Sequence, residues 1–348
     1  MKLSSDGPDQ AMLERAGRVL KEGGLVAFPT ETVYGLGGNA LDPGASEKIY
    51  KAKGRPSDNP LIVHIARLSD LYTVAAEVPE KALKMADKFW PGPLTMIFRK
   101  TDAVPDKTTG GLDSVAVRFP SDPIAQGLIL AAGGFVAAPS ANTSGRPSPV
   151  SASHVIEDLG DKVDIIIDGG EAVIGLESTI VDFTEEPPVI LRPGYITREK
   201  ISTVIPDIRT DPGIIAENSD IRPKAPGMKY RHYAPKASLS IVEGPEEEVV
   251  GLIRELTHDS ITKGKKAGII ATDETCAKYT EGNVKCIGSR GDEEEIAHNL
   301  YTVLRAFDDE EVDVILSESF DSPGMGQAIM NRLLKAAGHS ILYTGGKT

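Results

Sequence analysis

A proline-rich stretch at residues 207–236 constrains the fold of this chain more than any other feature, because it shows neither a helical nor a strand period. A loop of this length without regular structure is uncommon inside a compact domain. It therefore separates residues 1–206 from residues 237–348, and a chain of 348 residues suits two domains. Aromatic and basic side chains crowd the second half of this linker, so we expect it to pack against other parts of the chain.

Residues 1–206 alternate apolar segments of strand length with segments of helical period, which predicts an α/β domain. Two strands, at 178–183 and 189–192, leave no room for a helix between them. We therefore expect a mixed sheet rather than a fully parallel one. The other predicted strands are 25–28, 61–66, 94–98, 115–119, 135–138 and 163–167, and the predicted helices are 8–22, 44–53, 79–89, 123–132 and 151–159.

Residues 237–348 show a more regular pattern, in which each apolar strand is followed by a helix. This order predicts a smaller, parallel, Rossmann-like α/β domain. Its predicted strands are 239–243, 266–272, 284–288 and 312–318, and its predicted helices are 245–262, 292–307 and 325–338.

The net charge of −13 is shared unevenly between the two parts. Residues 1–236 carry 27 basic and 31 acidic side chains, whereas residues 237–348 carry 11 and 20. The second part should therefore repel nucleic acids. Residues 51–100 hold nine basic and five acidic side chains, so a local anion site in the first part is compatible with the overall charge.

The composition also bears on where the protein works. No apolar run approaches the roughly 20 residues of a membrane-spanning helix, and the N-terminus has no apolar signal core. We expect no membrane association, no export and a cytoplasmic location. The cysteines, Cys276 and Cys286, form no C-x-x-C motif, which fits a reducing compartment and argues against a disulfide framework.

Several common catalytic signatures are missing from the sequence. The segment YTGGKT resembles a P-loop, but Ile341 stands where the first glycine of that motif belongs. There is no H-E-x-x-H motif, Cys/His cluster or EF-hand loop, so no metal site can be predicted. There is also no G-x-S-x-G elbow, and we expect no covalent nucleophile.

Polar segments follow several predicted strands or helices of the first part, which is where α/β folds place their sites. They are rich in hydroxyls, amides, glycines and cations. Taken singly, each also fits an ordinary polar turn, but so many in about 200 residues indicate a binding site. The segments are 29–37, 51–60, 139–148, 175–179 and 191–194.

Cations in two of these regions indicate an anionic ligand. Arg55 follows a helix that stops at Gly54, close to Lys53, and such a pair combines a point charge with a bidentate fork. Arg118 lies between apolar residues and must find an anion or carbonyl groups, for which a ligand carboxylate would serve. His64 shares a strand face with an isoleucine and, by itself, is typical of a core residue.

With these segments assembled, the chain resembles the YrdC-like family, and in particular its two-domain branch, the threonylcarbamoyl-AMP synthases. The resemblance covers residues 10–236 in order and includes the linker segment PGMKYRHYAP. The other matching motifs are PTETVYGLG, KxKGRPxxNPLIVHI, FWPGPLT, VAVRFP, APSANTSGRPSP, GLESTIVD and LRPG.

The resemblance implies an enzyme that condenses L-threonine, bicarbonate or CO2, and ATP into L-threonylcarbamoyladenylate and releases pyrophosphate. It implies a mixed, twisted YrdC-like sheet followed by a Rossmann-like domain. The product feeds tRNA threonylcarbamoylation, so a downstream transfer enzyme is an expected partner, whereas direct tRNA binding stays open. Mg²⁺ is implied as the companion of ATP.

Carried over position by position, the resemblance also implies the binding residues. Tyr230 and neighbouring linker residues would close over the nucleotide. Threonine would be held by Thr32, His64, Arg118, Ser140 and Ser178, and ATP by Lys53, Arg55, Asn59, Asn142, Ser148 and Arg192.

Two other functions are compatible with parts of the sequence. An RNA-binding module would explain the basic surface around residues 48–55 and 81–100, but the net charge and the lack of an RRM, KH or OB signature count against it. A carbamoyl-transferring hydrogenase maturation protein would share the YrdC-like domain, but it would add acylphosphatase and zinc-finger segments that this sequence lacks.

Overall fold

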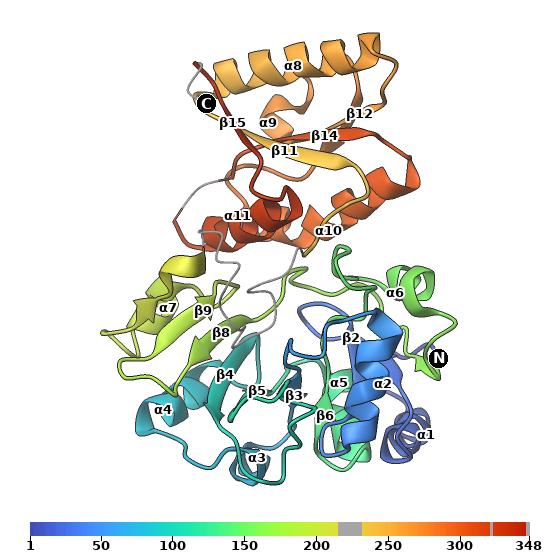
Figure 1. Cartoon of the computed structure of the whole chain (residues 1–348), viewed down its shortest axis with the longest axis vertical. Helices are drawn as coiled ribbons and strands as arrows, with labels where there is room; N and C mark the ends of the chain where they lie inside the picture. The colour runs from blue at the N-terminus through green and yellow to red at the C-terminus, as the bar shows by residue number, and fades with distance from the viewer. Residues whose placement is uncertain (215–231, 321–322, 346–348) are drawn as a thin grey trace. The chain divides into compact units, whose positions relative to one another are not determined.

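Figure 1 shows the computed structural model of the chain, which describes residues 1–214, 232–320 and 323–345. These residues form two compact units. The first contains residues 1–144 and 148–214, and the second contains residues 232–320 and 323–345. Residues 145–147, from the middle of the first predicted domain, belong to the second unit. No helix among the described residues is both long and apolar enough to cross a membrane.

The first unit alternates helices and strands. Its helices are α1 (Gln10–Lys21), α2 (Pro43–Lys53), α3 (Leu71–Val74), α4 (Glu80–Phe89), α5 (Pro123–Ala131), α6 (Ala152–Leu159) and α7 (Arg198–Ser202), with 3-10 turns at Leu68–Asp70 and Pro212–Ile214. Its strands are β1 (Val26–Phe28), β2 (Gly35–Asn39), β3 (Ile62–His64), β4 (Leu94–Arg99), β5 (Ser114–Arg118), β6 (Val136–Ala137), β7 (Ile165–Ile166), β8 (Thr179–Asp182), β9 (Val189–Arg192) and β10 (Arg209–Thr210).

Within the described residues, these strands form one mixed sheet in the order β10-β9-β8-β4-β5-β3-β6-β2-β1-β7. Strand β4 runs parallel to β8 and antiparallel to β5, while β3 runs parallel to β5. Strands β8 and β9 are antiparallel neighbours. The expectation of a mixed sheet is therefore confirmed, because a short connection can join antiparallel strands without a crossover helix.

The sheet carries apolar side chains on both faces. Successive side chains of a strand point to opposite faces, so neighbouring residues join different core clusters. In β1, Ala27 belongs to the larger core cluster, whereas its neighbours Val26 and Phe28 belong to the cluster formed with α1 and α5. Helices α1 and α5 touch closely at Gly17, where an added Cβ would lie 2.6 Å from the backbone of Ala131.

Two strands of the first unit were not predicted. Strand β2 overlaps the glycine-rich segment 29–37, which has no strand pattern. It needs glycine at position 37, because an added Cβ there would lie 3.0 Å from the side chains of Phe28 and Val136. Strand β10 falls inside the stretch expected to be an irregular linker, where it extends the sheet by pairing with β9. Pairing with an open edge strand thus gives regular structure to residues whose sequence has no strand period.

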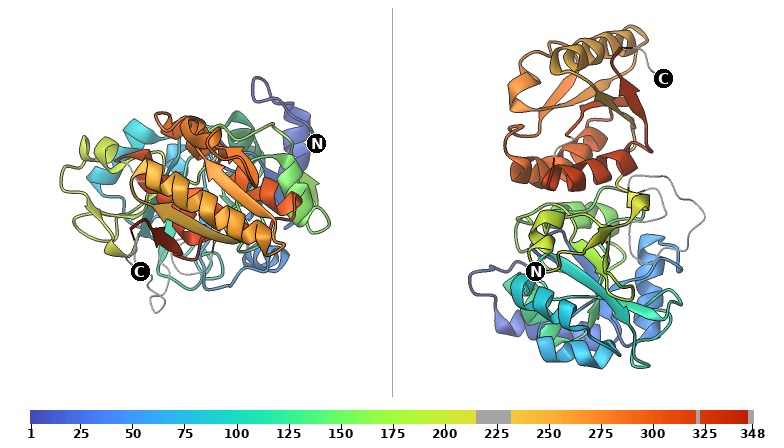
Figure 2. Two further views of the ribbon diagram at one scale, coloured as in Figure 1. Left: turned by 90° about the horizontal axis from the view of Figure 1, so that it is seen from above. Right: turned by 90° about the vertical axis from the view of Figure 1, so that its left-hand side faces the viewer.

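The second unit is a parallel α/β domain with the sheet order β13-β12-β14-β11-β15. Figures 1 and 2 show α8 on one side of this sheet and α10 and α11 on the other. The Rossmann-like outline is therefore confirmed. Its strands are β11 (Ser238–Glu243), β12 (Ala267–Ala271), β13 (Asn283–Cys286), β14 (Val314–Glu318) and β15 (Ile341–Tyr343), and its helices are α8 (Glu246–Thr262), α9 (Asp273–Cys276), α10 (Glu293–Asp309) and α11 (Met325–Ala336).

The cysteines differ from the expectation. Cys276, at the end of α9, and Cys286, at the end of β13, form a disulfide with their Cα atoms 5.9 Å apart. The absence of a C-x-x-C motif was a poor guide, because the connection from α9 into β13 brings the two residues together despite a separation of ten positions.

Two glycines in helices predict opposite effects of the same substitution. Gly17→Ala should lower the free energy of unfolding by about 1–3 kcal/mol, because the new methyl group overpacks the contact with α5. Gly251→Ala in α8 should raise it by about 0.5–1 kcal/mol, because nothing lies within 4 Å and alanine favours the helix.

Denaturant titration measures both effects. The fluorescence of Trp90, the only tryptophan, follows the first unit, and calorimetry follows the second. Equal stabilisation by both alanines would contradict the close packing at Gly17.

Candidate functional site

Three polar residues lie in a row across one edge of the first unit's sheet. His64 and Arg118 end the parallel strands β3 and β5 and are register partners. Thr95, near the start of the antiparallel strand β4, is the partner of Arg118 on its other side. By the period of two, these residues share a face with a cluster of buried apolar side chains, Ile62, Ile97, Ala116, Ile180, Val189 and Leu191.

Arg118 is the best-defined member of this row. Its side chain is buried, its Nη1 donates to Thr32 Oγ1 at 2.8 Å, and its Nη2 lies 2.7 Å from Glu31 Oε1. A buried guanidinium needs an opposite charge, and the sequence suggested a ligand carboxylate. The structure shows that Glu31, itself buried, already supplies one.

The Arg118–Glu31 pair keeps unused hydrogen-bonding groups. Among the described residues, Arg118 Nε has no hydrogen-bond partner, and neither carboxylate oxygen of Glu31 accepts an aligned hydrogen bond. Buried polar atoms are rarely left in this state unless a ligand or water completes them. A cation and an anion that lie side by side with free donors and acceptors suit a zwitterion, such as an amino acid.

The loop after β1 is braced from two sides. Thr30 Oγ1 lies 2.9 Å from Thr32 Oγ1 and donates to Val33 O at 2.7 Å. The backbone N–H groups of residues 174 and 175 donate to the carbonyl oxygens of Glu31 and Thr32, at 2.8 and 3.1 Å. Two predicted segments, 29–37 and 175–179, therefore meet at Arg118.

Ser178 connects this region to Arg192. Ser178 Oγ lies 2.7 Å from Thr95 Oγ1 and accepts from Arg192 Nη2 at 3.2 Å, while Arg192 Nε donates to Ser178 O at 3.0 Å. All three side chains are buried. The guanidinium at the end of β9 thus fixes a hydroxyl that lies beside the row of polar residues.

Lys53, the last residue of α2, binds the loop that follows β6. Its ammonium group donates to the carbonyl oxygens of Ser140 and Asn142 and to Asn142 Oδ1. Ser140 Oγ also donates to Asn142 Oδ1, at 2.6 Å. The buried lysine therefore determines how this loop presents its hydroxyl and amide groups.

Two further buried contacts hold the predicted nucleotide-binding residues Arg55, Asn59 and Ser148. Arg55 donates through Nη2 to Asn59 Oδ1 at 2.6 Å and through Nε to Asn59 O at 3.1 Å. Ser148 Oγ donates to Glu177 Oε1 at 2.5 Å. All four side chains are buried, so their positions are fixed by packing as well as by hydrogen bonds.

His64 lies in a strongly desolvated environment. Burial, together with the nearby positive charge of Arg118, lowers the pKa of His64 from 6.5 to about 3. Its Nδ1 lies 3.2 Å from Ile62 O, and its ring makes an edge contact with Phe28. The imidazole is therefore neutral at neutral pH and can offer a hydrogen bond but no charge.

Eleven of the predicted site residues thus lie in the first unit, linked by direct contacts, by strand register or by the chain itself. Tyr230 lies outside the described residues, and its role stays a prediction. Three buried residues were not predicted. Glu31 and Glu177 are acidic, which does not suit a site expected to bind anions, and Thr95 lies in an apolar strand. A polar residue within an apolar run was the available signal for Thr95.

No group of three or more His, Cys, Asp or Glu side chains within residues 1–214, 232–320 and 323–345 is arranged to hold a metal ion. The described site therefore offers no dedicated metal cage.

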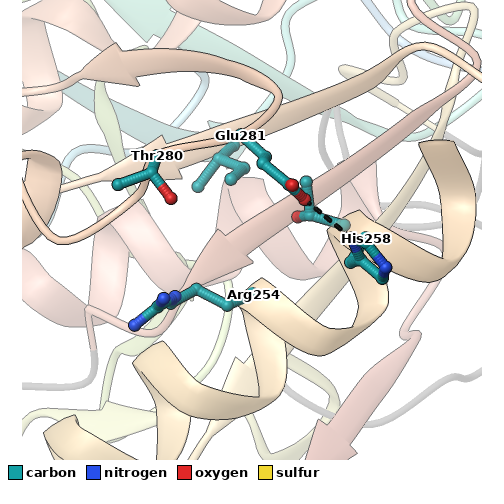
Figure 3. Close-up of a pocket in the computed structure, with 6 residues that line it drawn as sticks. Arg254, His258, Thr280 and Glu281 are labelled. Carbon is teal, nitrogen blue, oxygen red and sulfur yellow. Dashed lines mark hydrogen bonds and ion pairs between the residues drawn. The ribbon is translucent and has the colours of Figure 1, made fainter.

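The second unit contains a separate cavity of about 200 Å³ between α8 and the loop before β13 (Figure 3). His258 and Glu281 pair at its rim at 3.0 Å, and Arg254 extends along another side. Both members of the pair are largely exposed, so the pair contributes little to stability. None of the residues predicted from the sequence lines this cavity.

Comparison with known proteins gives matches over nearly the whole chain. Residues 18–194 match the Sua5/yciO/yrdC family, described as telomere recombination, and residues 196–338 match the threonylcarbamoyl-AMP synthase C-terminal domain. A threonylcarbamoyl-AMP synthase of Pyrococcus abyssi is 52% identical over 93% of both chains. One of Bacillus subtilis is 48% identical over 98% of this chain and 96% of the relative.

Solved structures agree with these matches. The crystal structure of P. abyssi Sua5 complexed with L-threonine superposes with a TM-score of 0.94, at 48% sequence identity, over 99% of both chains. The structure of Escherichia coli YciO covers 56% of this chain at 29% identity, with a TM-score of 0.51. These relatives support the synthase interpretation and give no support to the RNA-binding alternative.

The pKa of His64 predicts how stability depends on pH. Between about pH 6.5 and pH 3 the unfolded chain binds a proton at His64 and the folded protein does not. The free energy of unfolding should therefore decrease as the pH falls through this window, by up to about 1.4 kcal/mol per pH unit from this residue.

His64→Gln removes this contribution, so unfolding of the variant, followed by Trp90 fluorescence, should depend less steeply on pH. His258→Gln, at a side chain that is 66% exposed, is the matched control. An unchanged slope in His64→Gln would contradict the buried, neutral imidazole.

Proposed function

The chain belongs to the Sua5/yciO/yrdC family, and we propose that it is a nucleotidyltransferase that makes L-threonylcarbamoyladenylate. Its substrates are then L-threonine, bicarbonate or CO2, and ATP, and pyrophosphate is released. The main support is that relatives named threonylcarbamoyl-AMP synthase match both units, with a structural neighbour that is complexed with L-threonine.

The threonine site of this proposal is built around Arg118 and Glu31. The unused Nε–H of Arg118 suits the threonine carboxylate, and the carboxylate of Glu31, which accepts no aligned hydrogen bond, suits its amino group. The hydroxyl of Thr32 contacts Arg118, and the hydroxyl of Ser178 contacts Thr95, the strand partner of Arg118, so both suit the threonine hydroxyl. Ser140, in the loop after β6, and the neutral His64, at the end of β3, complete the predicted set.

The chemistry requires two bond-forming steps. The ammonium group of threonine first releases a proton to solvent, and the neutral amine then attacks the carbon of CO2 and releases a second proton to solvent as the carbamate forms. A carbamate oxygen then attacks the α-phosphorus of ATP, and the bond to pyrophosphate breaks. Fixed cations lower the barrier because negative charge grows on the phosphate oxygens, and we assign this role to Arg55 and Arg192.

The remaining predicted nucleotide-binding residues position the loop after β6. Lys53 holds Ser140 and Asn142, and Ser148 is held by Glu177. Asn59 orients Arg55. We propose that ATP enters as its Mg²⁺ complex, with the ion carried by phosphate oxygens and water, and we assign no protein ligand to it.

The product would be consumed by an enzyme that transfers the threonylcarbamoyl group to adenosine in tRNA. Because ATP and tRNA are shared with that step, we place the reaction in the cytoplasm. The excess of acidic residues in 237–348 disfavours a grip on nucleic acid by that part, so tRNA binding by this chain is not part of the proposal.

The direct test is an assay of the purified protein. It is incubated with ATP, Mg²⁺, bicarbonate and one amino acid at a time, and pyrophosphate and the adenylate are followed by mass spectrometry. We expect an adenylate only with threonine and bicarbonate. If no adenylate forms and calorimetry detects no threonine binding, the proposal is wrong.

Two arginine variants should separate the substrates. Arg118→Ala should weaken the use of threonine, and Arg55→Ala the use of ATP, each by about 1.5–3 kcal/mol, or roughly ten- to hundredfold, for the loss of a charge-assisted hydrogen bond. The two KM values measure this difference.

The control is Arg99→Ala, which removes an exposed pair with Asp113 and should leave both KM values unchanged. If Arg118→Ala left the dependence on threonine unaltered, the assignment of the carboxylate would have to be abandoned.

A further inference from the structure

The loop between two predicted nucleotide-binding residues, Asn142 and Ser148, is divided between the units. Its ends are anchored in the first unit, where Ser144 N–H donates to Lys53 O at 2.8 Å and Ser148 donates to Glu177. Its middle, residues 145–147, belongs to the second unit. The second unit therefore holds part of a loop whose two ends carry the proposed nucleotide site.

One face of α10 binds residues 145–147. Tyr301, Arg305 and Asp308 are spaced by four and three positions, so they lie on the same side of the helix. Arg305 Nη2 donates to Pro147 O at 2.6 Å, and Arg146 Nη2 lies 3.3 Å from Asp308 Oδ2. We call Arg305, Asp308 and the segment 145–147 the clasp.

Residues 234–236 make further hydrogen bonds with the clasp. Ala234 N–H donates to Gly145 O at 2.8 Å, and Lys236 N–H donates to Asp308 Oδ1 at 2.7 Å. The ring of Tyr233 packs on Tyr301 with their centroids 5.4 Å apart. Asp308 thus accepts from both the loop segment and the chain at residue 236.

Burial shows that these contacts are specific. Arg305 and Asp308 are 1% and 3% exposed. A buried charge is costly unless it is paired, so two such residues on one helix face indicate a requirement beyond packing the helix on its sheet. Loop residues are among the partners that meet it, because Arg305 donates to Pro147 O and Asp308 pairs with Arg146.

We propose that Arg305 and Asp308 are positioning residues for the nucleotide site. By holding residues 145–147, they fix the backbone on both sides, where Asn142 and Ser148 lie, and so make tight ATP binding depend on the second unit. This inference rests on the proposed function in taking Asn142 and Ser148 as ATP-binding residues. Threonine binding, which centres on Arg118, does not depend on the clasp.

The test compares Asp308→Ala with Asp309→Ala, a neighbouring acidic residue that is exposed. Calorimetry with a non-hydrolysable ATP analogue and, separately, with threonine is run on the full chain. Asp308→Ala should bind the analogue about tenfold more weakly and threonine as the wild type does, whereas Asp309→Ala should change neither. Asp308→Asn keeps an acceptor for Lys236 N–H but loses the charge opposite Arg146, so its effect should be intermediate.

Two further measurements keep the test decisive. Arg146→Gln breaks the same ion pair from the loop side and should reproduce the loss if Asp308→Ala fails to fold. Hydrogen exchange at the amides of Ala234 and Lys236 should become faster in Asp308→Ala and stay unchanged in Asp309→Ala. The exchange readout reports on the clasp without reference to activity.

The outcomes separate this inference from the proposed function. Unchanged analogue binding in both Asp308→Ala and Arg146→Gln, or an equal loss of threonine and analogue binding, would overturn the clasp. A wild type that binds the analogue but makes no adenylate would contradict the proposed function, and the affinities of the variants would still decide the clasp. A wild type that binds no analogue would overturn the nucleotide assignment on which the clasp rests.

Discussion

The proposed threonine site of the first unit depends on one buried ion contact, between Arg118 and Glu31. A guanidinium at the end of a central strand is costly unless an opposite charge lies beside it. Glu31 supplies that charge, and Thr32 accepts a further hydrogen bond, so the loop after β1 is drawn to the end of β5. The pair leaves donors and acceptors unused, which is why the site suits a zwitterion.

The sheet determines where the other polar groups can lie. Mixed strand directions bring the ends of β3, β5 and β9 to the same edge as the starts of β4 and β8. Alternation then places His64, Thr95 and Arg118 on the face that carries a layer of apolar side chains. Low polarity beside the row strengthens its electrostatic interactions and keeps His64 neutral.

The division of the chain into units does not follow the linear order of the sequence. The second unit is a parallel α/β domain whose helix α10 also binds residues 145–147. A loop anchored at both ends in one unit and in its middle by the other couples them through the covalent chain. Under the proposed function, this arrangement would give the second unit a role in nucleotide binding, although none of the sequence-predicted site residues lies in its described part.

The sequence by itself determined the α/β class, the mixed sheet and the polar segments of the proposed site, because periodicity, composition and motifs can be read along the chain. It indicated that Arg118 needs an anion or carbonyl groups as partners. Only the tertiary structure decided that Glu31 is the anion, that Thr95 joins Ser178, and that Asp308 pairs with Arg146. It also decided that Cys276 and Cys286 are bonded and that β10 extends the sheet. Most of these pairings join residues that are far apart in the sequence, and no local pattern indicates which partner a residue will have. Strand register and packing determine the partner.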